Sequence, residues 1–140
     1  MLHELIMGGD KNTALAKSLD ARMARQKVIA NNIANVETPG YHRKEVKFEE
    51  SLADALNRSL LQGAKTNAKH FELGRPRVGD VQFEVIEPVD HTMSSGVNNV
   101  DIDFEMASLA ENQIGFSYAM KMLKSSHDKL NAAIQGQPVK

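Results

Sequence analysis

The five histidines are the side chains of this 140-residue chain with the widest chemical range, because histidine binds metals and acts as an acid or base. They do not recur at the short intervals, with each other or with carboxylates, that metal sites use. They are His3, His42, His70, His91 and His127. Asp101 and Asp103 are two residues apart, but at a helix start they suit the helix dipole better than acid–base catalysis. We therefore expect no catalytic or metal site.

Composition narrows the function classes further. Gly8 and Gly9 lack the lysine and hydroxyl residue that complete a phosphate-binding loop, so no cofactor is expected. The absence of cysteine excludes disulfides and thiol catalysis. With 17 basic and 18 acidic side chains, the chain lacks the basic excess that is typical of nucleic-acid binding. No apolar run reaches about 18 residues, and the first residues do not resemble a cleavable secretion signal.

A long helix is predicted over residues 10–36 by apolar positions that alternate three and four residues apart. Pro39 disfavours helical geometry at Thr38, so the helix should end before it. The predicted seam contains Asn12, Leu15, Leu19, Arg22, Gln26, Ile29, Ile33 and Val36.

A second long helix is predicted over residues 101–134 by the same alternation. Asp101, Asp103 and Glu105 should stabilise its first turn, and Gly136 should end it. Its predicted seam contains Ile102, Met106, Leu109, Gln113, Phe116, Met120, Leu123, His127, Leu130 and Ile134. The polar seam residues (Arg22, Gln26, Gln113 and His127) are either metal or catalytic groups, or groups that set the helix register or contact a neighbouring subunit.

Residues 37–100 are expected to form a loop, a short helix over 48–61 and one half-buried strand over 81–85. The rest of residues 63–99 is rich in Gly, Pro, Asn and Ser and is predicted to be loop. The fold class is therefore mainly α in a single domain over residues 1–140. We expect an elongated two-helix coiled coil from the terminal segments, with a short extra helix and a small loop and β-strand region.

The two long helices are expected to pair in an antiparallel arrangement. Residues 10–36 carry five basic and two acidic side chains, whereas residues 101–134 carry three basic and five acidic ones. The second helix also has an apolar stripe outside its seam, formed by Ala107, Ile114, Tyr118 and Met122. Two interpretations remain open: the helix over 48–61 covers this stripe, or neighbouring copies of the chain do.

Three asparagines, Asn31, Asn32 and Asn35, stand where the first helix ends. Asparagine disfavours a helix interior, but its amide can satisfy open backbone groups or bridge to another chain. The alternative is an ordinary solvated helix end.

This segment, with residues 19–30 before it, resembles the N-terminal motif of the flagellar rod and hook proteins. The segment Asn98-Asn99-Val100-Asp101-Ile102-Asp103-Phe104-Glu105-Met106, followed by Leu109-Ala110-Glu111-Asn112, resembles the C-terminal helix start of the flagella basal body rod proteins. The resemblance covers residues 10–60 and 95–136. With the short central region it favours the proximal rod member, and FlgC-like rod subunits are the nearest alternative.

The resemblance implies a structural protein without enzymatic activity, exported through the flagellar type III apparatus without a cleavable signal. Such subunits stack helically into the rod, which crosses the periplasm and transmits torque. The implied partners are copies of the chain, FlgC-like and FlgF-like rod subunits, FliE and the MS-ring protein. The implied assembly motif is Asn31, Asn32, Ile33, Asn35, Thr38, Pro39, Gly40 and Tyr41.

The family also suggests an export-gate element, a Phe followed four residues later by an apolar residue. Phe48 and Leu52 fit this form, although packing on one helical face explains them equally well. The alternative function is a cytoplasmic helical adaptor that binds one partner through an apolar helix face. A histidine-dependent enzyme is the third hypothesis.

Overall fold

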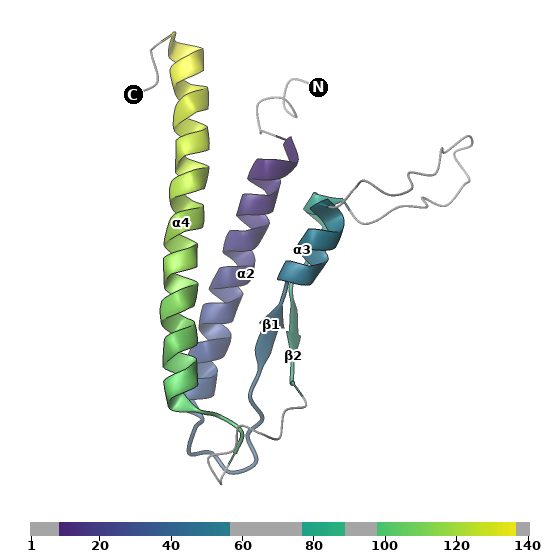
Figure 1. Cartoon of the computed structure of the whole chain (residues 1–140), viewed down its shortest axis with the longest axis vertical. Helices are drawn as coiled ribbons and strands as arrows, with labels where there is room; N and C mark the ends of the chain where they lie inside the picture. Colours follow the sequence, from purple (N-terminus) through teal and green to yellow (C-terminus); the bar gives the residue numbers. More distant parts are fainter. Residues whose placement is uncertain (1–8, 57–76, 89–97, 137–140) are drawn as a thin grey trace, which may run out of the picture.

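Two long helices that lie side by side and run in opposite directions dominate the protein (Figure 1). The computed structural model describes residues 9–56, 77–88 and 98–136. Helix α2 (Gly9–Ala34) and helix α4 (Ile102–Gln135) are about 39 and 51 Å long at about 1.5 Å per residue. α4 therefore continues past the start of α2 (Figure 1). This arrangement confirms the predicted mainly helical fold with paired terminal helices.

Both ends of α4 are capped by local chemistry. The carboxylate of Asp101 accepts hydrogen bonds from the backbone N–H groups of Asp103 (2.9 Å) and Phe104 (3.2 Å). These bonds satisfy backbone donors that a helix start leaves open. Gly136 has a φ of 66°, and its N–H donates to the carbonyls of Ala132 and Ala133. Glycine adopts this left-handed conformation without steric cost and ends the helix.

The central region places a small β-hairpin, a short α-helix and a 3-10 turn beside α2. Strand β1 (Glu45–Lys47) pairs antiparallel with β2 (Glu84–Ile86), and Val46 is opposite Val85. Helix α3 (Glu49–Leu56) follows β1, and the 3-10 turn η1 (Val78–Asp80) precedes β2. The predicted strand 81–85 overlaps β2 only at its end, because Val81 closes η1 instead. The end of the predicted helix over 48–61 and most of the predicted loop over 63–99 lie outside the described residues, at 57–61, 63–76 and 89–97.

A compact apolar core joins α2, α3 and η1. Ala21 on α2 is 1% exposed, and its small side chain leaves room for the aromatic ring of Phe48, which is 3% exposed. Burying a phenylalanine side chain contributes about 1.5–3 kcal/mol to stability. The cluster contains Ala21, Phe48, Ala55, Val78 and Val81, with Ala14 and Leu52 packed against it.

The inner side of α4 differs from the predicted seam. The buried residues Glu105, Asn112 and Ala119 recur every seven positions and form its most buried row. A second row is half-buried, as the seam predicted: Leu109, Phe116, Leu123 and Leu130. The remaining predicted seam positions are exposed, so the prediction that they lie at the contact between the two helices of one chain is wrong. They are Ile102, Met106, Gln113, Met120, His127 and Ile134.

The reason for this shift is the size and hydrogen bonding of the side chains at the contact. Ala119 and Gly115 leave room for α2 to approach closely, and Asn112 donates a hydrogen bond to the carbonyl of Arg22 on α2 (2.9 Å). A polar side chain with a partner can be buried, so it can displace a methionine from a helix contact. On α2, the predicted seam residues Leu19 and Ile29 are buried, whereas Gln26 is exposed.

The second apolar stripe of α4 is uncovered. α3 lies on the far side of α2 from α4, so it does not reach the stripe (Figure 1). Ile114 is 73% exposed, Tyr118 65% and Met122 46%, and Ala107 is also exposed. Within the described residues, where the third helix is Glu49–Leu56, the interpretation in which it covers this stripe is therefore wrong. In the described part of the chain, no helix is long and apolar enough to span a membrane.

Candidate functional site

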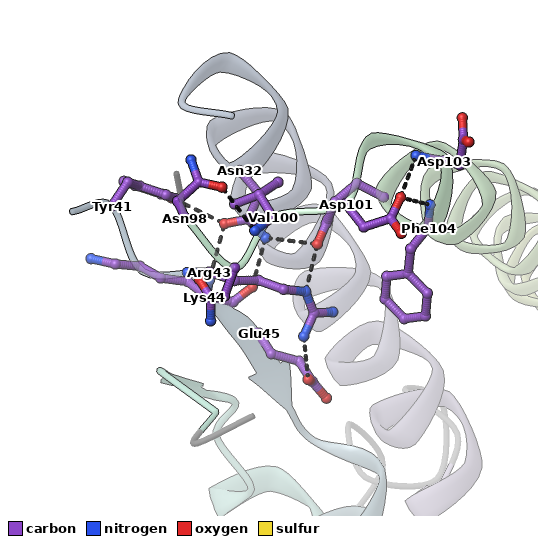
Figure 2. Close-up of polar contacts among 12 residues, drawn as sticks. Asn32, Tyr41, Arg43, Lys44, Glu45, Asn98, Val100, Asp101, Asp103 and Phe104 are labelled. Carbon is purple, nitrogen blue, oxygen red and sulfur yellow. Dashed lines mark hydrogen bonds and ion pairs between the residues drawn. The ribbon is translucent and has the colours of Figure 1, made fainter. Parts of the chain in front are cut away.

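The end of α2 is tied to the rest of the chain by one buried asparagine, Asn32, which is 0% exposed. Its amide nitrogen donates to the Lys44 carbonyl (2.8 Å) and to Glu105 (3.2 Å). Its amide oxygen accepts from the Lys44 N–H and the Tyr41 hydroxyl, both at 3.0 Å. An asparagine side chain has two donor hydrogens and two acceptor lone pairs, so all four are used here. Figure 2 shows Asn32, Tyr41 and Lys44 converging.

Arg43 and Glu105 form the charged part of the same cluster. The guanidinium Nε donates to Glu105 Oε1 at 2.6 Å. Its Nη1 donates to Glu45 at 3.1 Å (Figure 2). The guanidinium carbon also lies 4.9 Å from the centre of the Phe104 ring, a cation–π contact. Glu105 is 0% exposed, so these contacts offset the cost of removing its carboxylate from water.

The loop after α2 is folded by side-chain hydrogen bonds. Asn98 donates to the carbonyls of Asn35 (2.9 Å) and Val36 (2.5 Å), and its oxygen accepts from the Val100 N–H. Thr38 donates to the Asn35 side chain (3.2 Å). Gly40 has a φ of 75°, which glycine adopts without strain. Of the three asparagines at the helix end, Asn35 donates to the Asn31 carbonyl (2.8 Å) and Asn32 bonds to the backbone of Lys44, whereas the side chain of Asn31 is exposed.

A cleft of about 530 Å³ lies between α2, β1 and α4, next to this cluster. One of its walls holds a bidentate ion pair, in which Arg25 Nη1 and Nη2 lie 2.6 and 2.7 Å from the two carboxylate oxygens of Glu49. The hydrogen bond from Arg25 lowers the pKa of Glu49, and the same bond raises the pKa of Arg25. Partial burial raises the pKa of the Tyr41 hydroxyl.

The predicted assembly motif separates into two groups. Asn32 is buried, and Ile33, Asn35 and Tyr41 are half-buried, so these four stabilise the single chain. The exposed members are Asn31, Thr38, Pro39 and Gly40. Phe48 and Leu52 lie in the apolar core, which accounts for them in the folded chain; a role in export stays a prediction.

Among the described residues, no group of three or more histidine, aspartate or glutamate side chains could hold a metal ion. His42 and His127 are exposed, and His3, His70 and His91 lie outside the described part of the chain. Of the polar seam residues, Arg22 lies at the helix contact beside Gly115, whereas Gln26, Gln113 and His127 face away from it.

The residues that sequence reasoning missed are Arg43, Asn112 and the inward position of Glu105. Glu105 is interpreted from sequence as a dipole-stabilising group of the first helical turn, but it points into the cluster with Arg43. The signal that identifies it is its seven-residue spacing from Asn112 and Ala119 on the small-residue side of α4. Nothing in the sequence around Arg43 indicates its partner, which is 62 residues away.

Comparisons with known proteins place relatives of this chain among flagellar rod proteins. Residues 15–42 match the family model described as "Flagella basal body rod protein". The FlgB rod protein of Bacillus subtilis is 32% identical over 122 residues, which cover 87% of this chain and 91% of the relative. The FlgB of Borrelia hermsii is 34% identical over 84% of this chain and 90% of the relative, and that of Aeromonas hydrophila is 28% identical over 86% and 89%.

The fold and the matched motif thus define a structural protein of the flagellar basal body rod. Within that class, the extent of the matches shows that the chain belongs to the flagellar basal body rod protein FlgB family. Assembly with copies of itself and with other flagellar components follows from this membership, as does a location in the basal body.

Proposed function

We propose that the chain is a subunit of the proximal rod, which assembles helically and transmits torque across the periplasm. The observation that carries this proposal is the uncovered stripe on α4, where Ile114 and Tyr118 are 73% and 65% exposed. Large apolar side chains gathered on one exposed face favour an interface with another protein. Neighbouring subunits that cover this stripe would gain the hydrophobic stabilisation that a single chain lacks.

Torque transmission requires that the helices of one subunit do not rotate against each other. The cluster of Asn32, Arg43 and Glu105 supports this requirement, because it links α2, the segment before β1 and α4 through buried hydrogen bonds. Removing one member of a buried ion pair typically costs about 3–5 kcal/mol. A twist that separates α4 from α2 at this end would meet that cost.

The proposed partners are copies of the chain, FlgC-like and FlgF-like rod subunits, FliE, the MS-ring protein and the flagellar type III export apparatus. Export of the chain in an unfolded form fits the burial of Phe48, which is 3% exposed in the folded chain. An export gate could therefore bind Phe48 and Leu52 only while the chain is unfolded.

The test is deletion of the coding sequence in the source bacterium, followed by complementation. We expect deleted cells to be non-motile, with basal bodies that lack the rod, and the intact gene to restore both. The protein should also be found in purified basal bodies by immunoblotting. Normal motility of the deletion strain would contradict the proposal, and detection of the protein in the cytosol alone would favour a cytoplasmic adaptor.

A further inference from the structure

Helix α2 has an exposed side of its own, apart from the sides that contact α4, β1 and η1. Its exposed residues recur three or four positions apart, so they lie on one face of the helix. We call this surface the outer face of α2; it consists of Ala16, Asp20, Met23, Lys27, Ala30 and Ala34. Met23 is 49% exposed although it is apolar. The outer face therefore offers small and apolar side chains, with one acid and one base among them.

The charged residues of the outer face lack partners within the described residues, where neither Asp20 nor Lys27 forms an ion pair. The stripe of α4 carries polar groups in the same condition. Glu111 lies in line with the stripe, is exposed and forms no ion pair in the described part of the chain; Arg25, which feels its charge, is already paired with Glu49. The Tyr118 hydroxyl has no hydrogen bond there either. Each surface thus presents groups that another molecule can pair.

The spacing of these groups is the same on the two helices. Seven residues, about 10.5 Å of helix, separate Asp20 from Lys27, and the same interval separates Glu111 from Tyr118. An antiparallel arrangement that sets the Lys27 ammonium opposite the Glu111 carboxylate therefore also sets Asp20 opposite the Tyr118 hydroxyl, which can donate to it. A parallel arrangement satisfies only one of the two pairs. The order of the groups therefore selects antiparallel packing.

The apolar side chains fit in the same register. Ala16 lies opposite Met122, and Met23 lies beside Ile114, which is 73% exposed in the single chain. A small side chain opposite a large one lets two helices approach closely, because the large one fills the space that the small one leaves. Polar and apolar groups therefore agree on one alignment of the two surfaces.

We propose that the outer face of α2 of one copy docks antiparallel on the α4 stripe of a second copy, with Lys27 bound to Glu111. The two surfaces are different parts of the chain, so the contact is heterologous. Repetition of such a contact produces an open helical array or a ring instead of a closed dimer. This inference rests on the proposed function as a rod subunit and names the surface that covers the stripe.

The test is a charge exchange in the complete chain, expressed in cells that lack the native copy. Lys27→Glu and Glu111→Lys, each alone, should lower the amount of protein in purified basal bodies by about tenfold or more, because like charges then face each other. The double variant should restore incorporation. The matched controls are Lys47→Glu on β1 and Glu50→Lys on α3, which change exposed charges outside both surfaces and should be incorporated normally.

Circular dichroism of the purified variants separates a folding defect from an assembly defect. If Lys27→Glu folds and assembles normally, the stripe is covered by something other than the outer face of α2, and the docking contact is wrong while the rod assignment stands. A folded double variant that is not restored also overturns the contact. Absence of the unmodified chain from basal bodies would instead remove the rod assignment itself.

A cross-link provides a second, independent measurement, which also decides the matter if a charge variant does not fold. The chain contains no cysteine, so Ala16→Cys and Met122→Cys can be introduced together and treated in isolated basal bodies with a short bis-maleimide. A heterologous contact links each copy to two others, so covalent dimers, trimers and larger species are expected. Each single-cysteine variant should stay monomeric, and monomer alone in the double variant overturns the contact.

Discussion

Arg43 Nε and Glu105 Oε1 lie 2.6 Å apart, although 62 residues separate them in the sequence. The side chains are 12% and 0% exposed, so the pair joins the segment before β1 to the first turns of α4 inside the protein. Asn32 on α2 donates to the same glutamate oxygen. Asn32 and Arg43, which are 11 residues apart, therefore meet a carboxylate that lies more than 60 residues further along the chain, and the relative position of the two long helices depends on this contact.

The first prediction concerns this carboxylate. Glu105→Ala should lower the free energy of unfolding by about 3–5 kcal/mol, because it leaves the half-buried guanidinium of Arg43 without its nearest acceptor. Urea denaturation followed by circular dichroism measures the change. The control is Asp128→Ala on the same helix, an exposed residue whose replacement should change the free energy by no more than about 0.5 kcal/mol. Equal effects of the two substitutions would show that the cluster does not stabilise the fold.

Asn32 and Asn31 offer a matched comparison, since they are adjacent and of the same type. Asn32→Ala should cost about 1–3 kcal/mol, because the N–H and carbonyl of Lys44 lose their partner. Asn31→Ala should be nearly neutral, because that side chain is exposed and only the Asn31 backbone carbonyl is used, by Asn35. The midpoint of thermal unfolding of each variant checks this, and an equal loss at both positions would refute the distinction.

The sequence predicts the two long helices and their antiparallel pairing, because their apolar spacing persists over many turns and their ends carry a cap and a glycine. It misplaces one row of the α4 contact, because Met106 and Met120 are apolar and hydrophobic spacing favours them over Glu105 and Asn112. Hydrophobic spacing contains no information on a polar side chain that finds its partner on another element. The hairpin is missed for a related reason, since strands of three residues are too short to show an alternation.

The exposed stripe of α4 gives the third prediction. Ile114→Glu and Met122→Glu should leave the unfolding free energy within about 0.5 kcal/mol of the unmodified chain, because both side chains are exposed. Both should block incorporation into the rod, because an unpaired charge is costly to bury in an interface. Lys121→Glu, which changes an exposed charged residue next to the stripe, is the control and should assemble. Motility in soft agar and immunoblots of basal bodies report the outcome, and normal rods in both glutamate variants would contradict the role of the stripe.

The fourth prediction is a dependence on acid pH. The pKa of Glu49 in the folded chain lies below the ordinary value of 4.5, because Arg25 donates to its carboxylate. The unfolded chain therefore binds this proton first, and the stabilisation is present above about pH 4.5 and lost as the pH falls through the lower folded value. Because the Glu49 side chain is 63% exposed, the loss should not exceed about 1 kcal/mol.

Glu49→Gln should abolish that part of the acid sensitivity. Urea titrations of both proteins at about pH 7 and about pH 3 measure it, and the unmodified chain should lose more stability between the two. The same loss in both proteins would mean that the ion pair of Arg25 and Glu49 does not contribute to the stability of the fold.

The fifth prediction concerns local stability along α4. In the isolated chain, amides of residues 130–135 should exchange with solvent faster than those of residues 109–119, because α4 continues past the start of α2 (Figure 1). In assembled rods the difference should become smaller as neighbours cover the free end. Hydrogen exchange with mass spectrometry checks both states, and uniform protection along α4 in the isolated chain would contradict the expected gradient.

The most direct test of the central claim is a density map of the intact basal body with this chain traced in it. The account predicts that Ile114, Tyr118 and Met122 of each copy are buried against a neighbouring subunit, while the cluster around Glu105 stays within its own chain. A map in which these three side chains face solvent would contradict it.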